Sequence, residues 1–292
     1  MDIAHHAAIG VAGMLTLQAA GEEAAGVAFV SGCVAPDLDV AFMALGKRFY
    51  LRHHQEISHS VLLAPIYAIG GAALLSLALG WNGSIFVAAL AGLWLHSALD
   101  LTNTFGIAVF APLSKRRSSL DAVFFIDGVA WILTLGAIAS LSRWKHAWIG
   151  ALYLAVLALY LGIRYRQHLH VMRKLGCLYA IPSSWHPFEY FTFSENGEYR
   201  MSVFNAITGH ERNVTKIVPA DSKIEAWANR SQVFRDMQHV ARALRITEVR
   251  TDATGVTIVA CDLAVRNFGG RFARTELRFD LEGNLLHETA AI

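Results

Sequence analysis

The sequence predicts an all-α polytopic membrane bundle with a C-terminal cytoplasmic α+β domain. Of the 292 residues, 54% are hydrophobic and only 16% are charged, which is typical of a membrane protein. The charges are unevenly spread, because residues 1–163 contain eight Lys and Arg and nine Asp and Glu, whereas residues 164–292 contain seventeen and fourteen. We therefore expect a membrane-embedded domain over residues 1–165 and a soluble domain over residues 175–292.

Four apolar stretches have the length of about 20 residues that a membrane-spanning helix requires. These stretches are residues 61–79, 84–101, 122–141 and 147–163. Two shorter apolar segments, 7–20 and 24–36, come before them, and they could span, form a re-entrant hairpin or lie buried in the bundle. The expected bundle therefore has four clear spans and two short N-terminal helices.

Basic residues beside the four spans predict the orientation of the bundle, because cytoplasmic loops carry the excess of Lys and Arg. Alternating the spans places ten Lys and Arg on one side and only Arg143 and Lys145 on the other. The side with ten is predicted to be cytoplasmic, and the C-terminal domain follows on that side.

The C-terminal domain is expected to contain four to six strands. Two alternating runs in residues 189–200 surround an Asn-Gly pair, which is a strong hairpin signal. Apolar residues recur at helical spacing over residues 222–244. Further alternating runs cover residues 246–251, 255–265 and 273–280.

Charge and cysteine content exclude some classes of partner and site. A net charge of +2 provides no concentrated basic face, so nucleic acid is not expected as a partner. Three widely separated cysteines indicate neither a disulfide framework nor a thiolate metal cluster. Membrane lipid is the expected partner, and the sequence identifies no protein partner for the C-terminal domain.

Histidines and aspartates gather at the predicted cytoplasmic ends of the apolar segments. An ionised side chain at the centre of a membrane helix costs about 2.5–3.5 kcal/mol on insertion scales, so such residues are usually paired, hydrated or functional. The residues at this end are His6, Asp37, Asp39, His54, His59, His96, Asp100, Asp121 and Asp127. Their convergence on one layer predicts a metal site.

The spacing of some of these residues suits metal ligation. His96 and Asp100 are four residues apart, so they share one helix face and can bind a single ion. Asp37 and Asp39 could occupy alternate positions of an extended segment or bridge two ions. A shell of histidine and aspartate without cysteine suits Zn²⁺, Mn²⁺ or Fe²⁺.

Other polar residues have competing structural explanations. Asp121 fits the N-cap of the third span and a metal ligand equally well. Asp127 lies about two turns inside an apolar run and has little structural reason to be there. His5 is expected in a solvated N-terminal turn. The basic run 115–117 is more typical of a topology anchor than of a phosphate clamp.

The order and separation of these residues resemble the inner-membrane, metal-dependent hydrolase family described as LexA-binding or DUF457 proteins. The matching segments, across about residues 1–165, are His6 with Gly10, Ala35-Pro36-Asp37-Leu38-Asp39, Arg52-His53-His54, Ser58-His59-Ser60, Leu95 to Asp100, Asn103-Thr104-Phe105-Gly106, Pro112, and Asp121 with Phe125-Ile126-Asp127. One departure is Gln55, which stands where an arginine that could touch the substrate is expected. The family is remotely similar to zinc-dependent phospholipase C and P1-type nucleases.

This resemblance implies a metal-dependent hydrolase in a bacterial inner membrane, with two or three zinc ions, or manganese or iron in their place. The implied ligands are His6, Asp37, Asp39, His54, His59, His96 and Asp100. Asp127 or Asp121 would then be a ligand, an orienting residue or a catalytic base.

A site at headgroup depth favours a lipid-borne phosphoester, either a phospholipid or a polyprenyl phosphate, and a metal there would lower the pKa of water to about 7. One alternative function is a non-catalytic membrane scaffold that binds a cytoplasmic protein. The other is a metal transporter, although transport sites usually lie near the bilayer midplane.

Overall fold

The computed structural model describes residues 2–46, 55–268 and 273–291, and the chain forms two compact units. The first unit comprises Met1–Gln167 with Ser184–Pro187, and the second comprises His168–Ser183 with Phe188–Ile292. One long helix, α7 (Ala147–Leu175), begins in the first unit and ends in the second.

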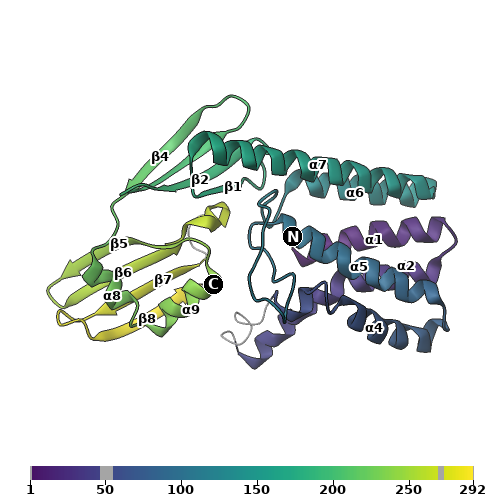
Figure 1. Ribbon diagram of the computed structural model, residues 1–292, viewed down its shortest axis with the longest axis horizontal. Helices are drawn as coiled ribbons and strands as arrows, with labels where there is room; N and C mark the ends of the chain where they lie inside the picture. The colour runs from purple at the N-terminus through teal and green to yellow at the C-terminus, as the bar shows by residue number, and fades with distance from the viewer. Residues whose placement is uncertain (1, 47–54, 269–272, 292) are drawn as a thin grey trace. The chain divides into compact units, whose positions relative to one another are not determined.

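Helices that lie side by side build the first unit (Figure 1). They are α1 (Ile3–Ala19), α2 (Glu23–Val34), α4 (Ala64–Leu79), α5 (Gly83–Thr102), α6 (Gly128–Trp144) and the first part of α7. Two 3₁₀ segments, η1 (Ala35–Leu45) and η2 (Ile57–His59), follow α2 and precede α4. Helix α2 packs between α1 and α5, while α4 packs on α5 and α6 packs on α1.

Three helical stretches among the described residues are long and apolar enough to cross a membrane. They are Glu23–Ala44, which joins α2 to η1, Gly83–Thr102 and Ala147–Leu175. The expected spans at 84–101 and 147–163 coincide with two of them. Those expected at 61–79 and 122–141 correspond to the shorter apolar helices α4 and α6, of 16 and 17 residues.

The expected start of the third span at residue 122 is wrong, because α6 begins only at Gly128. The apolar residues before it, among them Ala122, Val123 and Phe124, are buried in the loop that joins α5 to α6. The backbone N–H groups of Ala122 and Val123 donate to the carbonyl of Thr102. Hydrophobic side chains here fill the interior of a loop instead of covering a helix.

Glycines allow α2 and α5 to approach until their backbones touch. A Cβ atom at Gly32 would lie 2.3 Å from the carbonyl oxygen of Ala89, and one at Gly92 would lie 2.3 Å from that of Phe29. Small residues at helix interfaces permit such close contact in membrane proteins. The C-terminal end of α2 is therefore held directly against α5.

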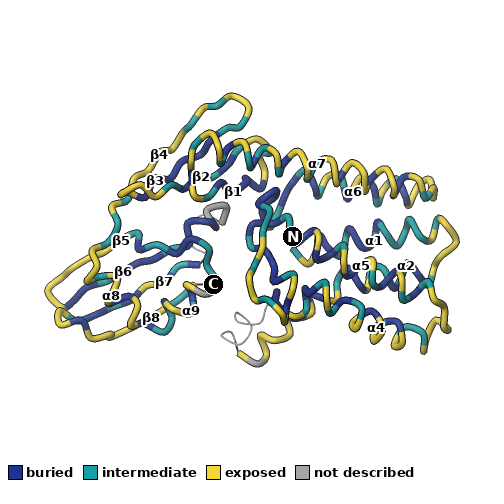
Figure 2. Tube along the Cα trace, in the orientation of Figure 1, coloured by how far each residue is buried: buried dark blue, intermediate teal, exposed yellow. Residues whose placement is uncertain are grey.

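The outer surface of the first unit is apolar. On α4, Ile69, Leu74 and Leu77 are exposed, while Ala68 and Ala72 on its other face are buried. Figure 2 shows exposed positions recurring along α4 and α7. Large exposed apolar surfaces mark contact with lipid or with a partner, and the membrane-length helices of this unit favour lipid.

Two four-stranded antiparallel sheets form most of the second unit. The first contains β1 (Tyr179–Pro182), β2 (Glu189–Glu195), β3 (Tyr199–Asn205) and β4 (Glu211–Ile217) in that order. The second contains β5 (Leu244–Asp252), β6 (Gly255–Asp262), β7 (Arg274–Phe279) and β8 (Leu285–Ala291). The 3₁₀ segment η3 (Leu263–Phe268) follows β6.

The α+β character of this unit and its hairpin at residues 189–200 are as expected, since Glu195 pairs with Tyr199 across the Asn-Gly turn. The eight strands in the described part of the chain exceed the four to six expected. The helix expected over 222–244 is divided into α8 (Ser222–Ala228) and α9 (Gln232–Val240). Ser231 causes the division, because its side chain accepts from the N–H of Phe234 and caps α9.

Replacing Gly92 with valine is expected to destabilise the first unit by about 1–3 kcal/mol or more, because the new side chain overlaps the backbone of α2. Gly136→Val is the matched control, since a Cβ atom at Gly136 on α6 meets no atom within 4 Å. Thermal unfolding of the detergent-purified variants measures the difference. Equal stability of the two variants would contradict the close α2–α5 contact.

Candidate metal centre

Two aspartate and two histidine side chains meet in the first unit, near the C-terminal end of α5. This metal-site group is Asp37 of η1, His59 of η2, and His96 and Asp100 of α5. All four residues are buried, and one potential ligand atom from each lies within 4.8 Å of the others. Segments separated by up to 63 residues in sequence therefore converge on one point.

Distances within the group are those expected of ligands that share a cation. His59 Nε2 lies 3.3 Å from Asp100 Oδ2 and 3.6 Å from Asp37 Oδ1. His96 Nε2 lies 3.5 Å and 3.7 Å from the same two oxygens. Direct N–H···O bonds are about 2.7–3.2 Å long, whereas two tetrahedral ligands at about 2.0–2.1 Å from zinc are about 3.3–3.4 Å apart.

Hydrogen bonds on the far side of each imidazole fix which ring nitrogen faces the group. His96 Nδ1 lies 2.7 Å from the carbonyl oxygen of Cys33, and a carbonyl only accepts, so Nδ1 carries the proton. Ser58 donates its hydroxyl proton to Asp39 at 2.8 Å and therefore accepts from His59 Nδ1 at 2.9 Å. Both histidines thus direct an Nε2 lone pair at the two carboxylates.

Buried lone pairs that face one another need a positive charge between them. In the part of the chain that the structure describes, neither His96 Nε2 nor Asp37 Oδ2 has a hydrogen-bond partner, although both atoms are buried. Buried polar atoms cost free energy unless they are compensated, and buried charges cost more. Two imidazole nitrogens with two carboxylates fit a divalent ion of the zinc, manganese or iron type.

His6 and Asn103 hold Asp100 in place from the side away from the group. His6 Nε2 lies 2.9 Å from Asp100 Oδ1, and the amide of Asn103 donates to the same oxygen at 3.0 Å. The ring of His6 also stacks on that of His96, with 3.8 Å between centroids. Such outer contacts orient the ligands of metal sites and raise their basicity.

Asp37 and Asp39 make different contacts. Both lie in the 3₁₀ segment η1, so the extended segment, one of the two arrangements considered for them, is not formed. Asp37 faces His59 Nε2, whereas Asp39 Oδ2 lies 3.7 Å from His59 Nδ1. Asp39 also accepts from the backbone N–H of Gln55 at 3.1 Å. The two carboxylates therefore flank one imidazole at opposite nitrogens.

The charges around His59, which lies in η2 ahead of α4, favour a cation at this point. Burial by itself lowers the pKa of His59, but the neighbouring carboxylates of Asp100, Asp37 and Asp39 outweigh burial and raise that pKa to about 9. A proton and a metal ion compete for the same nitrogen, because metal ligation requires the neutral imidazole.

The remaining predicted site residues lie outside the group or outside the described residues. Asp127 caps α6: its carboxylate accepts from the N–H of Ala130 at 2.9 Å and from the Tyr160 hydroxyl at 2.9 Å. Asp127 therefore has a structural role, which the apolar residues around it in the sequence did not indicate. Asp121 is a loop residue with φ of 48°, so it is not the N-cap of α6, which was one of the two roles considered for it. His54 falls outside the described residues.

His5 is fully buried, so the solvated turn expected for it is wrong. Its ring stacks on Trp131 with 4.6 Å between centroids, and its Nε2 lies 3.0 Å from Thr134 Oγ1. Asp2 is the N-cap of α1, which places His5 already inside the helix and against α6.

Several contacts of the group were not predicted from the sequence. The carbonyl of Cys33 is a backbone group, so no residue type signals it. Asn103 follows Asp100 by three residues, a spacing that could have indicated contact at a helix end. Gln55 binds Asp39 through its backbone, and its side-chain oxygen accepts from Arg117 at 3.4 Å.

The chain belongs to the YdjM inner membrane protein family, whose model matches residues 1–171 and thus the whole metal-site group. It is similar to the protein named "Uncharacterized protein YfhP" of Bacillus subtilis (strain 168). The two are 24% identical over 265 residues, which cover 80% of this chain and 81% of the relative, so the similarity extends into the second unit. No solved structure matches the chain.

Removal of a ligand is expected to abolish metal binding. Protein purified in detergent should contain at least one zinc, manganese or iron ion per chain by elemental mass spectrometry, and His96→Ala or Asp100→Asn should lose most of it. His146→Ala, which changes an exposed histidine of the same unit, is the control. A metal-free wild type, or an unchanged metal content in both ligand variants, would refute the site.

Proposed function

We propose that this member of the YdjM family is a metal-dependent hydrolase of lipid phosphoesters that works at the cytoplasmic face of the membrane. The observation that carries the proposal is the metal-site group, in which two oriented imidazoles and two buried carboxylates face one point. Hydrolysis, rather than storage of an ion, is favoured by Arg117, which two hydrogen bonds link through Gln55 to Asp39 beside the group.

Each residue has a defined part in this proposal. The metal-site group would hold the ion, His6 and Asn103 would orient Asp100, and the Ser58–Asp39 pair would keep His59 in its ligand tautomer. A bound divalent ion supplies a Lewis acid that activates water and neutralises charge on phosphoryl oxygens.

The basic run 115–117 supplies a candidate for recognition of phosphate. Arg117 donates to the side chain of Gln55, and the backbone of Gln55 donates to Asp39. Two hydrogen bonds thus link a guanidinium to a residue that contacts His59. Because a guanidinium matches the geometry of phosphate oxygens, Arg117 is the residue that we expect to bind the phosphoryl group, and Gln55 positions it.

Depth in the membrane supports a lipid-borne substrate. Asp100 and His96 lie two and six residues before the last residue of α5, which corresponds to about 3–9 Å along the helix axis. The 20 residues of α5 span about the thickness of the hydrocarbon core. A phosphate carried by a lipid would therefore reach this depth without leaving the membrane.

Hydrolysis is expected in vesicles of phosphatidylethanolamine and phosphatidylglycerol, with or without added polyprenyl phosphate. Mass spectrometry should detect diacylglycerol, prenol or released phosphate with zinc-loaded wild type, and Asp100→Asn or chelation should reduce the product to background. Asn103→Ala, which removes only an orienting contact, should lower the rate by about 10–100-fold. A metal-loaded protein that cleaves none of these lipids would overturn the proposal.

The cytoplasmic location that we propose for the second unit has its own test. Green fluorescent protein fused after the last residue should be fluorescent in bacterial cells, whereas alkaline phosphatase at the same position should be inactive, because the basic excess favours a cytoplasmic C-terminus. Active phosphatase would place the C-terminus, and by alternation the metal-site group, on the opposite face.

A further inference from the structure

An apolar groove of about 680 Å³ lies beside the metal-site group. Its lining includes Leu38 of η1, Ile66 and Gly70 of α4, and Leu93 of α5. It also includes Asp39 and Ser58, the pair that holds His59 Nδ1. Part of the groove wall is therefore formed by residues that orient a metal ligand, while most of the remaining lining is apolar.

We propose that this groove binds the hydrocarbon chain of the lipid whose phosphate is cleaved at the metal-site group. The inference rests on the proposed function. It adds a binding site for the hydrocarbon chain of the substrate, which a metal ion cannot recognise. Ile66 and Leu38 line the groove and are also about 60% exposed, so the groove communicates with the outer surface of the unit. At the depth of α4 that surface faces lipid.

Size argues for a lipid chain rather than a protein helix. A volume of 680 Å³ is within the range of about 300–1,000 Å³ that small-molecule sites occupy. A helix about 10 Å across would fill that volume within about 9 Å of its length, which is fewer than two turns. A flexible chain can instead follow the groove along α4.

Charge also favours this arrangement. Asp39 is the one charged residue in the described lining, and no Lys or Arg there could bind an anionic headgroup. The phosphate must therefore lie outside the groove, where the metal-site group and Arg117 would bind it. The resulting separation of polar and apolar binding matches an amphipathic substrate.

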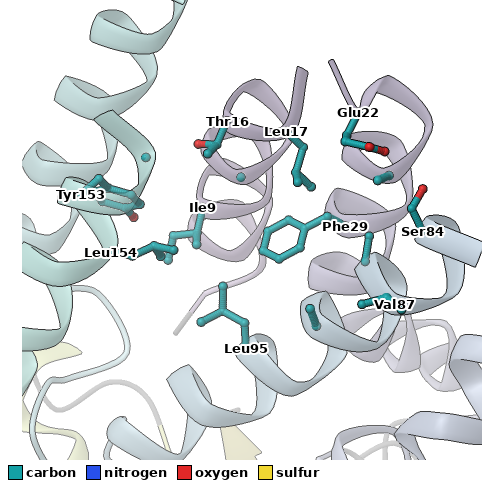
Figure 3. Close-up of a pocket in the computed structure, with 15 residues that line it drawn as sticks. Ile9, Thr16, Leu17, Glu22, Phe29, Ser84, Val87, Leu95, Tyr153 and Leu154 are labelled. Carbon is teal, nitrogen blue, oxygen red and sulfur yellow. The ribbon is translucent and has the colours of Figure 1, made fainter. Parts of the chain in front are cut away.

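A second apolar cavity, of about 490 Å³, fits this role less well (Figure 3). It lies among α1, α2, α5 and α7, where Phe29 and Leu154 contribute to its wall. None of the metal-site group, nor Asp39 or Ser58, lines it. Its polar lining residues include Glu22 and Ser84, at the ends of α2 and α5 farthest from the metal-site group.

Gly70 allows the groove to be filled without disturbing the helix packing. A Cβ atom at Gly70 meets no atom within 4 Å, and the same is true of its neighbour Gly71, which does not line the groove. Gly70→Trp should therefore occupy the space of the chain, and Gly71→Trp is the matched control. Gly70→Leu provides a smaller obstruction should the tryptophan variant fail to fold.

The experiment places full-length, zinc-loaded protein in phosphatidylethanolamine and phosphatidylglycerol vesicles that contain a phosphatidic acid probe with a diazirine near the end of one acyl chain. After irradiation, mass spectrometry should find adducts on Ile66 or Leu93 in wild type and Gly71→Trp. In Gly70→Trp these adducts should fall by at least about tenfold, because the chain is sterically excluded. Metal content should be equal in all three proteins.

Adducts spread evenly over the apolar surface, confined to the cavity of Figure 3, or unaffected by both Gly70 variants would overturn the groove. An equal loss in Gly71→Trp would do the same. Groove adducts in a protein that cleaves no phosphoester would support the groove and overturn the proposed hydrolysis. Cleavage with adducts elsewhere would overturn the groove alone.

Discussion

Contact between the backbones of α2 and α5 is the constraint on which the metal-site group depends. Gly32 and Gly92 bring the helices close enough for the carbonyl of Cys33 to accept from His96 Nδ1. That hydrogen bond selects the tautomer in which Nε2 faces Asp37, three residues beyond α2. Helix packing, ring orientation and ligand geometry are therefore one arrangement, and displacement of either helix would move all three.

Charge burial is the second constraint, and it explains the number of contacts behind the ligands. Two carboxylates and two imidazoles in a buried position are tolerated only when positive charge and hydrogen bonds compensate them. His6, Asn103 and Ser58 supply those hydrogen bonds from three separate segments. The site is thus held from outside by polar side chains whose removal would leave its ligands misdirected rather than absent.

Helical spacing and the cost of charge in a membrane placed His96, Asp100, Asp37 and His59 in one layer with five other residues, but they did not distinguish these four from the rest. The roles of individual carboxylates were not accessible, because an apolar run before Asp127 can fill a loop as well as a helix. Backbone acceptors such as the Cys33 carbonyl cannot be predicted from residue type, because every residue has a carbonyl group. Strand β1 was missed because it has only four residues, and β4 and β8 were missed because edge strands with mostly exposed residues show little alternation.

Asp39 belongs both to the wall of the groove and to the hydrogen bonds that orient His59. Any occupant that shifts this carboxylate changes the affinity of His59 for a cation, and thermodynamic linkage requires the cation to change the affinity for the occupant by the same factor. Lipid and metal would then act as mutual effectors. The affinity of the protein for its ion would then depend on which lipids the surrounding membrane contains.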